Sequence, residues 1–151
     1  MKHLCEKPLK LTISSSPTHL PIVRAALEKM CEKIGFDHDA IGKVILSADE
    51  ALTNIIRHAY AGAEDRPIDI ELTPLCDEAS PGLRICIRDY GQHVDPSKIR
   101  SRDLADVRPG GLGVHIMTQC MDDVEYQAAE GGGTELTMTK AVRSRRQESP
   151  T

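Results

Sequence analysis

The segment Leu46–Tyr60, which reads LSADEALTNIIRHAY, decides the fold expected for this chain of 151 residues. Three polar residues in it, Glu50, Asn54 and His58, follow one another at intervals of four. Four α-helical residues advance about 400°, so these side chains form one stripe along three turns. The aliphatic residues between them predict that the same helix packs against a core. Taken alone, the stripe fits a ligand site and a solvated helix face equally well.

Composition indicates a single soluble domain with an aliphatic core. Apolar residues make up 40% and charged residues 28% of the chain, which has one Phe, three Tyr and no Trp. Few aromatics and a net charge of −4 argue against a nucleic-acid partner. No apolar run approaches the length of a membrane span or a signal sequence. Five widely spaced cysteines, an odd number, indicate reduced thiols. We therefore expect a cytoplasmic protein without a membrane partner.

Hydrophobic periodicity predicts an α+β fold, with helices concentrated early and paired strands later. The expected strands are 9–13, 67–75, 83–87, 124–128 and 135–139. The expected helices are 20–34, a longer one capped by Asp37 or Asp39 and running to about Tyr60, and 112–121. This order predicts a two-layer sandwich, in which helices cover one face of a mixed β-sheet. Residues 1–142 form one domain in this interpretation, 89–111 form a functional lid, and 143–151 form a disordered tail.

Three further segments carry residues suited to a nucleotide. Asp89-Tyr90-Gly91 offers a carboxylate to an exocyclic amine, beside a glycine that lets a ligand approach the backbone. Gly110-Gly111-Leu112-Gly113 leads into an expected helix, whose first amides favour a phosphate. Gly131-Gly132-Gly133-Thr134 is either a hairpin turn or a pocket wall. Alone, Asp89-Tyr90-Gly91 is better explained as a plain turn, but the four segments together indicate a nucleotide site.

In this order and spacing the segments resemble the GHKL ATPase superfamily, whose ATP-binding domain has the Bergerat fold. The motifs that carry the resemblance are Glu50-x-x-x-Asn54-x-x-x-His58-Ala59-Tyr60, Asp89-x-Gly91, Gly111-Leu112-Gly113 and Gly133-Thr134. Within the superfamily, the chain is similar to the serine-protein kinases of the anti-sigma-factor type, the Rsb/Spo branch. The similarity extends from about Leu9 to Lys140.

The resemblance implies a role for each motif. Asn54 would bind Mg²⁺ through its side-chain oxygen, and Glu50 would be the catalytic base for an attacking hydroxyl. Asp89 would bind the adenine amine of ATP. The other residues that the resemblance places at the ATP are His58, Ala59, Gly91, Gly111, Leu112, Gly113 and Thr134, with a lid arginine that is either Arg108 or Arg102.

Two functions agree with the resemblance. In the first, a serine/threonine protein kinase transfers the γ-phosphate of ATP to a small antagonist protein and regulates a sigma factor or a similar regulator. In the second, the chain is a non-catalytic ATP-binding module that sequesters such a partner. The second is motivated by His93, which stands where many members carry another glycine after Asp89-x-Gly91. The resemblance also implies a homodimer.

Overall fold

The computed structural model describes residues 7–76, 80–91 and 109–143, and of residues 109–113 it describes the backbone alone. The strands are β1 (Leu9–Ser14), β2 (Pro67–Leu75), β3 (Gly82–Asp89), β4 (Asp123–Ala128) and β5 (Thr134–Ala141). The helices are α1 (Leu20–Ile34), α2 (His38–Asn54) and α4 (Pro109–Cys120), with a short 3-10 helix η2 (Pro17–His19) and a π-helical turn η3 (Ile55–Ala59).

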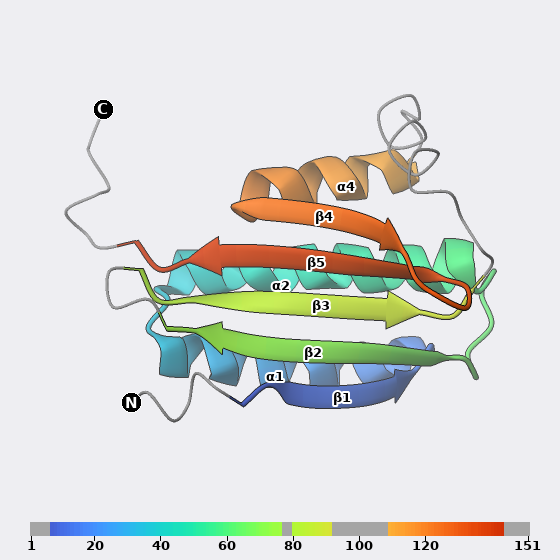
Figure 1. The fold of residues 1–151 in the computed structure, drawn as a ribbon, viewed down its shortest axis with the longest axis horizontal. Coiled ribbons are helices and arrows are strands. Elements are labelled where there is room, and N and C mark those ends of the chain that lie inside the picture. The colour runs from blue at the N-terminus through green and yellow to red at the C-terminus, as the bar shows by residue number, and fades with distance from the viewer. Residues whose placement is uncertain (1–6, 77–79, 92–108, 144–151) are drawn as a thin grey trace.

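The strands form one sheet in the order β1-β2-β3-β5-β4, and α1, α2 and α4 lie on one face of it (Figure 1). The predicted two-layer α+β fold is confirmed. The sheet is not mixed, however, because all four neighbouring pairs of described strands are antiparallel. The chain does enter β4 parallel to β3 after α4, but β5 lies between these two strands, so they share no ladder of hydrogen bonds.

Local sequence signals account for the ends of the first two long helices. Gly35 follows α1 in the left-handed region, with φ of 109°, and its N–H donates to the carbonyl of Cys31. The side chain of Asp37 caps α2 by accepting a hydrogen bond from the N–H of Ala40 at 2.8 Å. The structure thus selects Asp37 over Asp39 as the cap.

The core between helices and sheet is aliphatic, as the composition predicts. Alternate residues of β2 are buried, in the pattern expected for a strand with one covered face. Among the largest fully buried side chains are Val23, Leu27, Val44, Leu52, Ile68, Ile70, Leu72, Leu83, Ile85, Ile87, Met117 and Met138.

Two smaller expectations need correction or a limit. Cys31, Cys86 and Cys120 carry free thiols, but Cys76 is disulfide-bonded, so the prediction of reduced thiols is wrong for Cys76. Arg143, placed in the predicted tail, forms an ion pair with Asp122 at 3.2 Å. The rest of that tail, 144–151, and most of the predicted lid, 92–108, lie outside the described residues.

Candidate functional site

Helix α2 carries the two residues predicted to hold the metal and act as the base. Glu50 and Asn54 are both half-buried, one turn apart on the helix. Among the described residues neither side chain makes a hydrogen bond or an ion pair. Asp49, the adjacent acid, is engaged differently, because both of its oxygens accept from Nε of Arg24 on α1, at 2.9 and 2.8 Å. Glu50 is therefore the acid of this pair that is available to a ligand.

The polar stripe predicted over three α-helical turns changes geometry after its second member. Regular α-helix ends at Asn54, and the N–H of Tyr60 bonds to the carbonyl of Ile55, five residues back, at 3.0 Å. His58 lies on this π-helical turn and is exposed. It therefore does not continue the α-helical register of Glu50 and Asn54.

The next element of the site is the end of β3, where Asp89 is only 2% exposed. Its Oδ1 accepts a hydrogen bond from the N–H of Gly91 at 3.0 Å, and its Oδ2 accepts one from the hydroxyl of Thr134. A carboxylate has lone pairs to accept further bonds, so these contacts fix its orientation and leave capacity for a ligand amine. Thr134, predicted from its position after the glycines, does reach Asp89.

Gly91 packs directly against the π-helical turn. A Cβ atom built on Gly91 would lie 2.8 Å from the carbonyl oxygen of Ala59 and 3.0 Å from its Cβ. The predicted residues Ala59, Asp89, Gly91 and Thr134 are thus brought together at one end of the sandwich. Figure 1 shows the end of α2, the tip of β3 and the β4–β5 hairpin gathered there.

The β4–β5 hairpin closes over the same strand end. Gly131, Gly132 and Gly133 all have positive φ, of 86°, 112° and 83°. A side chain at Gly133 would overlap the backbone carbonyl of Asp89. From the other side of β3, Nη2 of Arg88 donates to the carbonyl of Glu130 at 3.0 Å. Arg88 was not predicted as a site residue. As the neighbour of Asp89 on a strand it points to the opposite face of the sheet, and this alternation is the one signal that places it.

A second residue that sequence reasoning left without a role is Tyr60. Its hydroxyl donates to the carbonyl of Pro67 at 2.5 Å and accepts from the N–H of Tyr90 at 2.7 Å. The side chain is only 7% exposed. A buried tyrosine requires a partner for its hydroxyl, which is the one signal that could have predicted such a contact.

The glycine segment Gly110–Gly113, predicted to lead into a helix, lies inside α4. Helix α4 begins at Pro109, so Gly110, Gly111, Leu112 and Gly113 all belong to its first residues, whereas the predicted helix began at Leu112 and left Gly110 and Gly111 in a loop. The first N–H groups of an α-helix have no acceptor within the helix, so this backbone still offers donors to a phosphate. Arg108, its alternative Arg102, and His93 lie outside the described residues.

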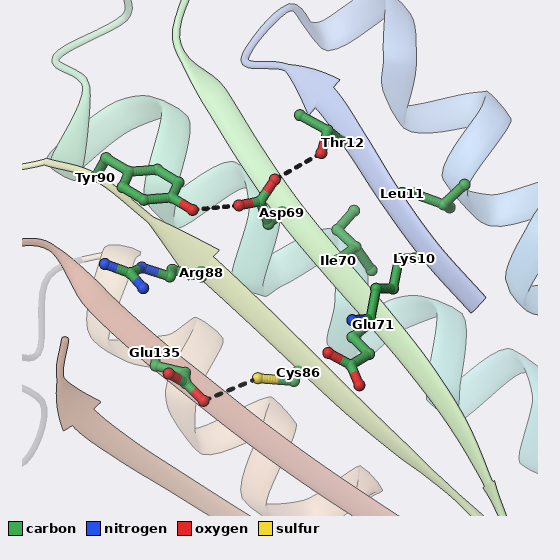
Figure 2. Close-up of a pocket in the computed structure, with 10 residues that line it drawn as sticks. All are labelled: Lys10, Leu11, Thr12, Asp69, Ile70, Glu71, Cys86, Arg88, Tyr90 and Glu135. Atoms are coloured by element: carbon green, nitrogen blue, oxygen red, sulfur yellow. Dashed lines mark hydrogen bonds between the residues drawn. The ribbon is translucent and has the colours of Figure 1, made fainter. Parts of the chain in front are cut away.

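A hollow of about 390 Å³ lies on the opposite, open face of the sheet (Figure 2). Asp69 joins its two sides by accepting from the hydroxyls of Thr12 and Tyr90. These two hydrogen bonds lower the pKa of the Asp69 carboxyl, and the bond from Thr12 has the larger effect. None of the predicted nucleotide residues lines this hollow, and its mixed acids and bases lack a phosphate cradle. The chemistry therefore favours the helical face as the nucleotide site.

Comparison with known proteins agrees with this geometry. Residues 13–140 match the model of the family described as the histidine kinase-like ATPase domain. The chain belongs to this family. The resemblance inferred from the four motifs is thereby confirmed, and the shared fold accounts for the way Asp89, Gly91 and Thr134 converge.

Among its relatives in this family are serine-protein kinases named RsbW. The chain is 28% identical to that of Listeria innocua over 149 residues, covering 93% of this chain and 90% of the relative. It is 25% identical to that of Bacillus subtilis, covering 95% and 91%.

Two solved structures share the fold. One contains the RsbU and RsbW domains of Rv1364c from Mycobacterium tuberculosis, with a TM-score of 0.66 at 22% identity, over 91% of this chain and 33% of that one. The other is the SiaB–SiaC complex from Pseudomonas aeruginosa, with a TM-score of 0.63 at 11% identity, over 89% of each chain. In the part of this chain that the structure describes, no helix has the length and hydropathy needed to cross a bilayer.

Proposed function

We propose that this chain is an ATP-dependent serine/threonine protein kinase that phosphorylates a small antagonist protein and thereby regulates a sigma factor or a similar regulator. The observation that carries the proposal is a pair of side chains, Glu50 and Asn54, that make no hydrogen bond or ion pair with the other residues that the structure describes, together with a separate buried carboxylate, Asp89, held by Gly91 and Thr134. The first pair suits phosphate chemistry and the second group suits recognition of a base. Similarity to proteins named serine-protein kinase RsbW supports the choice of reaction.

Glu50 is the proposed catalytic base. A hydroxyl oxygen of the acceptor forms a bond to the γ-phosphorus of ATP while the bond from that phosphorus to the bridging oxygen of ADP breaks. The proton of the hydroxyl passes to the Glu50 carboxylate. Asn54, one turn on, would hold Mg²⁺ through its amide oxygen, and that ion would neutralise charge on the phosphates.

Asp89 is the proposed reader of adenine. The carboxylate is fixed by two hydrogen bonds and accepts a third from the exocyclic amine of the base. Gly91 has no side chain, so its backbone packs closely against Ala59. The same lack of a side chain lets the base approach this backbone in the proposed complex. Guanine carries a carbonyl oxygen where adenine carries the amine, so the buried carboxylate disfavours GTP.

The alternative function remains an ATP-binding module that holds its partner without phosphorylating it, which His93 motivates. Both versions share the nucleotide site and differ only in transfer. We also place the protein in the cytoplasm as part of the proposal, because ATP and the proposed partner, a sigma factor or a similar regulator, are found there.

A homodimer is the third part of the proposal. The open face of the sheet carries bases, Lys10 and Arg88, beside the acids Glu71 and Glu135. Two copies related by a twofold axis can pair such a mixed surface with itself. Sedimentation of the wild-type chain and of Glu71→Lys tests this, since the reversed charge is expected to shift the equilibrium toward monomer. A wild-type chain that sediments as a monomer at every concentration contradicts it.

The deciding experiment incubates the full chain with Mg-ATP, radiolabelled at the γ-phosphate, and a small antagonist protein encoded nearby. We expect label on a serine or threonine of the antagonist. Glu50→Gln is expected to keep ATP binding and to lose 10²- to 10⁴-fold in transfer, on the order of the usual contribution of a general base. Asp49→Asn is the matched control, because this neighbouring acid is bound to Arg24. The Asp49→Asn variant is expected to transfer phosphate as the wild type does.

The outcomes separate the two functions. Unchanged transfer in Glu50→Gln contradicts the assigned base. Stabilisation by Mg-ATP without phosphate transfer to any tested antagonist favours the non-catalytic module. A chain that Mg-ATP does not stabilise at all contradicts both.

A further inference from the structure

We infer that Tyr60 is a positioning residue, whose hydroxyl fixes the base-reading end of β3 against the helix that carries Glu50 and Asn54; the inference rests on the proposed function. Tyr60 touches no proposed ligand directly. It acts through the backbone of Tyr90, which lies between Asp89 and Gly91.

The Tyr60 hydroxyl joins three segments that are distant in sequence. Tyr60 itself directly follows η3. Its hydroxyl donates to the carbonyl of Pro67 at the start of β2 and accepts from the N–H of Tyr90, just beyond the end of β3. Both hydrogen bonds are short and the ring is buried, so water does not readily replace either partner. Desolvation raises the pKa of the Tyr60 hydroxyl above its ordinary value of 10.0, so the hydroxyl remains a donor at neutral and at mildly alkaline pH.

The neighbouring contacts connect this hydroxyl to the position of Asp89 and Gly91. The N–H of Tyr90 is held by Tyr60, and the N–H of Gly91 is held by the Asp89 carboxylate. Gly91 also abuts Ala59, the residue before Tyr60. One steric and one polar contact from consecutive residues therefore set where the Asp89 segment lies on the helix end.

Asn54 ends α2 and Tyr60 directly follows η3, so the two residues flank the π-helical turn, six residues apart. A nucleotide bound as proposed spans from the metal at Asn54 to the carboxylate at Asp89. The distance between these two ends depends on how the strand end is seated, and the hydroxyl of Tyr60 is the polar contact that seats it. Loss of that hydroxyl leaves the part-buried N–H of Tyr90 without its acceptor.

The test compares Tyr60→Phe with Tyr90→Phe. Each removes one hydroxyl, but that of Tyr90 bonds to Asp69 on the open face of the sheet. For Tyr60→Phe we expect ATP affinity to fall about tenfold and GTP affinity to change little, so that discrimination between the two bases falls. At saturating ATP, kcat is expected to stay within about twofold, because Glu50 and Asn54 keep their places. Tyr90→Phe is expected to match wild type in affinity and discrimination.

A role in stability alone predicts a different pattern. It would lower the free energy of unfolding of Tyr60→Phe and leave the ratio of ATP to GTP affinity unchanged, and that result overturns the inference. Wild-type protein that binds no ATP contradicts the proposed function instead. Should Tyr60→Phe not fold, hydrogen exchange of wild type decides: the Tyr90 amide is expected to be protected, and rapid exchange of that amide overturns the inference.

Discussion

The hydroxyl of Thr134, the first residue of β5, donates a hydrogen bond to Oδ2 of Asp89, the last residue of β3. Two neighbouring strands thus cooperate in orienting one buried carboxylate. The side chain of Asp89 cannot rotate freely, because its other oxygen is bound to the N–H of Gly91. A carboxylate held from two sides can discriminate between ligand amines and ligand carbonyls.

Replacing Thr134 by valine removes the hydroxyl and keeps the shape of the side chain. We expect the stability of the protein to fall by about 1 kcal/mol, the usual value of one such hydrogen bond. ATP affinity is expected to fall several-fold, because Asp89 is left with one fixed oxygen. Calorimetric titration with ATP checks this, and Thr134→Ser, which keeps the hydroxyl, is expected to restore affinity. Equal affinities for all three proteins would show that the hydroxyl does not orient the carboxylate.

Gly133→Ala tests the close approach of the hairpin to β3. Gly133 has a φ of 83°, and an added Cβ would overlap the carbonyl of Asp89. We expect a loss of about 2 kcal/mol or more in the free energy of unfolding, measured in urea. Gly131→Ala is the matched control: its φ is 86°, but nothing lies within 4 Å of the added atom. It is expected to cost only the backbone strain, about 1 kcal/mol. Equal losses in the two variants would contradict the close approach.

Asn54→Ala and His58→Ala separate two members of the polar stripe. Asn54 is on regular α-helix beside Glu50, whereas His58 is exposed on the π-helical turn. We expect Asn54→Ala to abolish the additional thermal stabilisation that Mg²⁺ gives to the ATP complex. His58→Ala is expected to retain that increment. Thermal shifts with ATP, with and without Mg²⁺, measure it, and an undiminished Mg²⁺ increment in Asn54→Ala contradicts the assigned ligand.

Cys31 makes stability depend on alkaline pH. Burial raises the pKa of its thiol from 9.0 to about 12. The unfolded chain therefore ionises this thiol at lower pH than the folded chain does. Its contribution to stability is present below pH 9 and is lost as the pH rises from 9 toward 12.

The comparison that isolates this effect is wild type against Cys31→Ala in urea. The variant is less stable at pH 8 because it leaves a cavity. Cys86, whose thiol pKa burial raises to about 11, ionises on unfolding in both proteins, whereas only the wild type gains the Cys31 thiolate. The difference between the two free energies of unfolding is therefore expected to narrow from pH 9 to pH 11. A constant difference over this range would contradict the shifted pKa.

Much of the fold follows from local patterns in the sequence. The alternation of Ile68, Ile70 and Leu72 predicts β2, and the spacing of buried residues from Leu20 to Gly35 predicts α1 with its cap. These patterns report which face of an element is covered, which is a local property. The motifs likewise predict that Asp89 and Thr134 serve one site, and the structure brings them together.

Other features depend on long-range contacts that periodicity does not report. The antiparallel sheet follows from the insertion of β5 between β3 and β4, which is a choice of topology. The π-helical turn after Asn54 and the contacts of Tyr60 arise from packing against β2 and β3. The early start of α4 runs against the low helix propensity of glycine, so propensity alone began the helix at Leu112 and left Gly110 and Gly111 in a loop.

The π-helical turn has a consequence for any change in length at this point of the chain. A turn of this kind contains one residue more than an α-helical turn. Deleting exposed Arg57 would make Tyr60 the fourth residue after Ile55, so the existing hydrogen bond from the N–H of Tyr60 to the carbonyl of Ile55 would close an ordinary α-helical turn. We therefore expect Ala59 to stay against Gly91 and Tyr60 to stay near Pro67 in such a variant. Inserting a residue there would require a still wider turn, so this segment is expected to tolerate shortening better than lengthening.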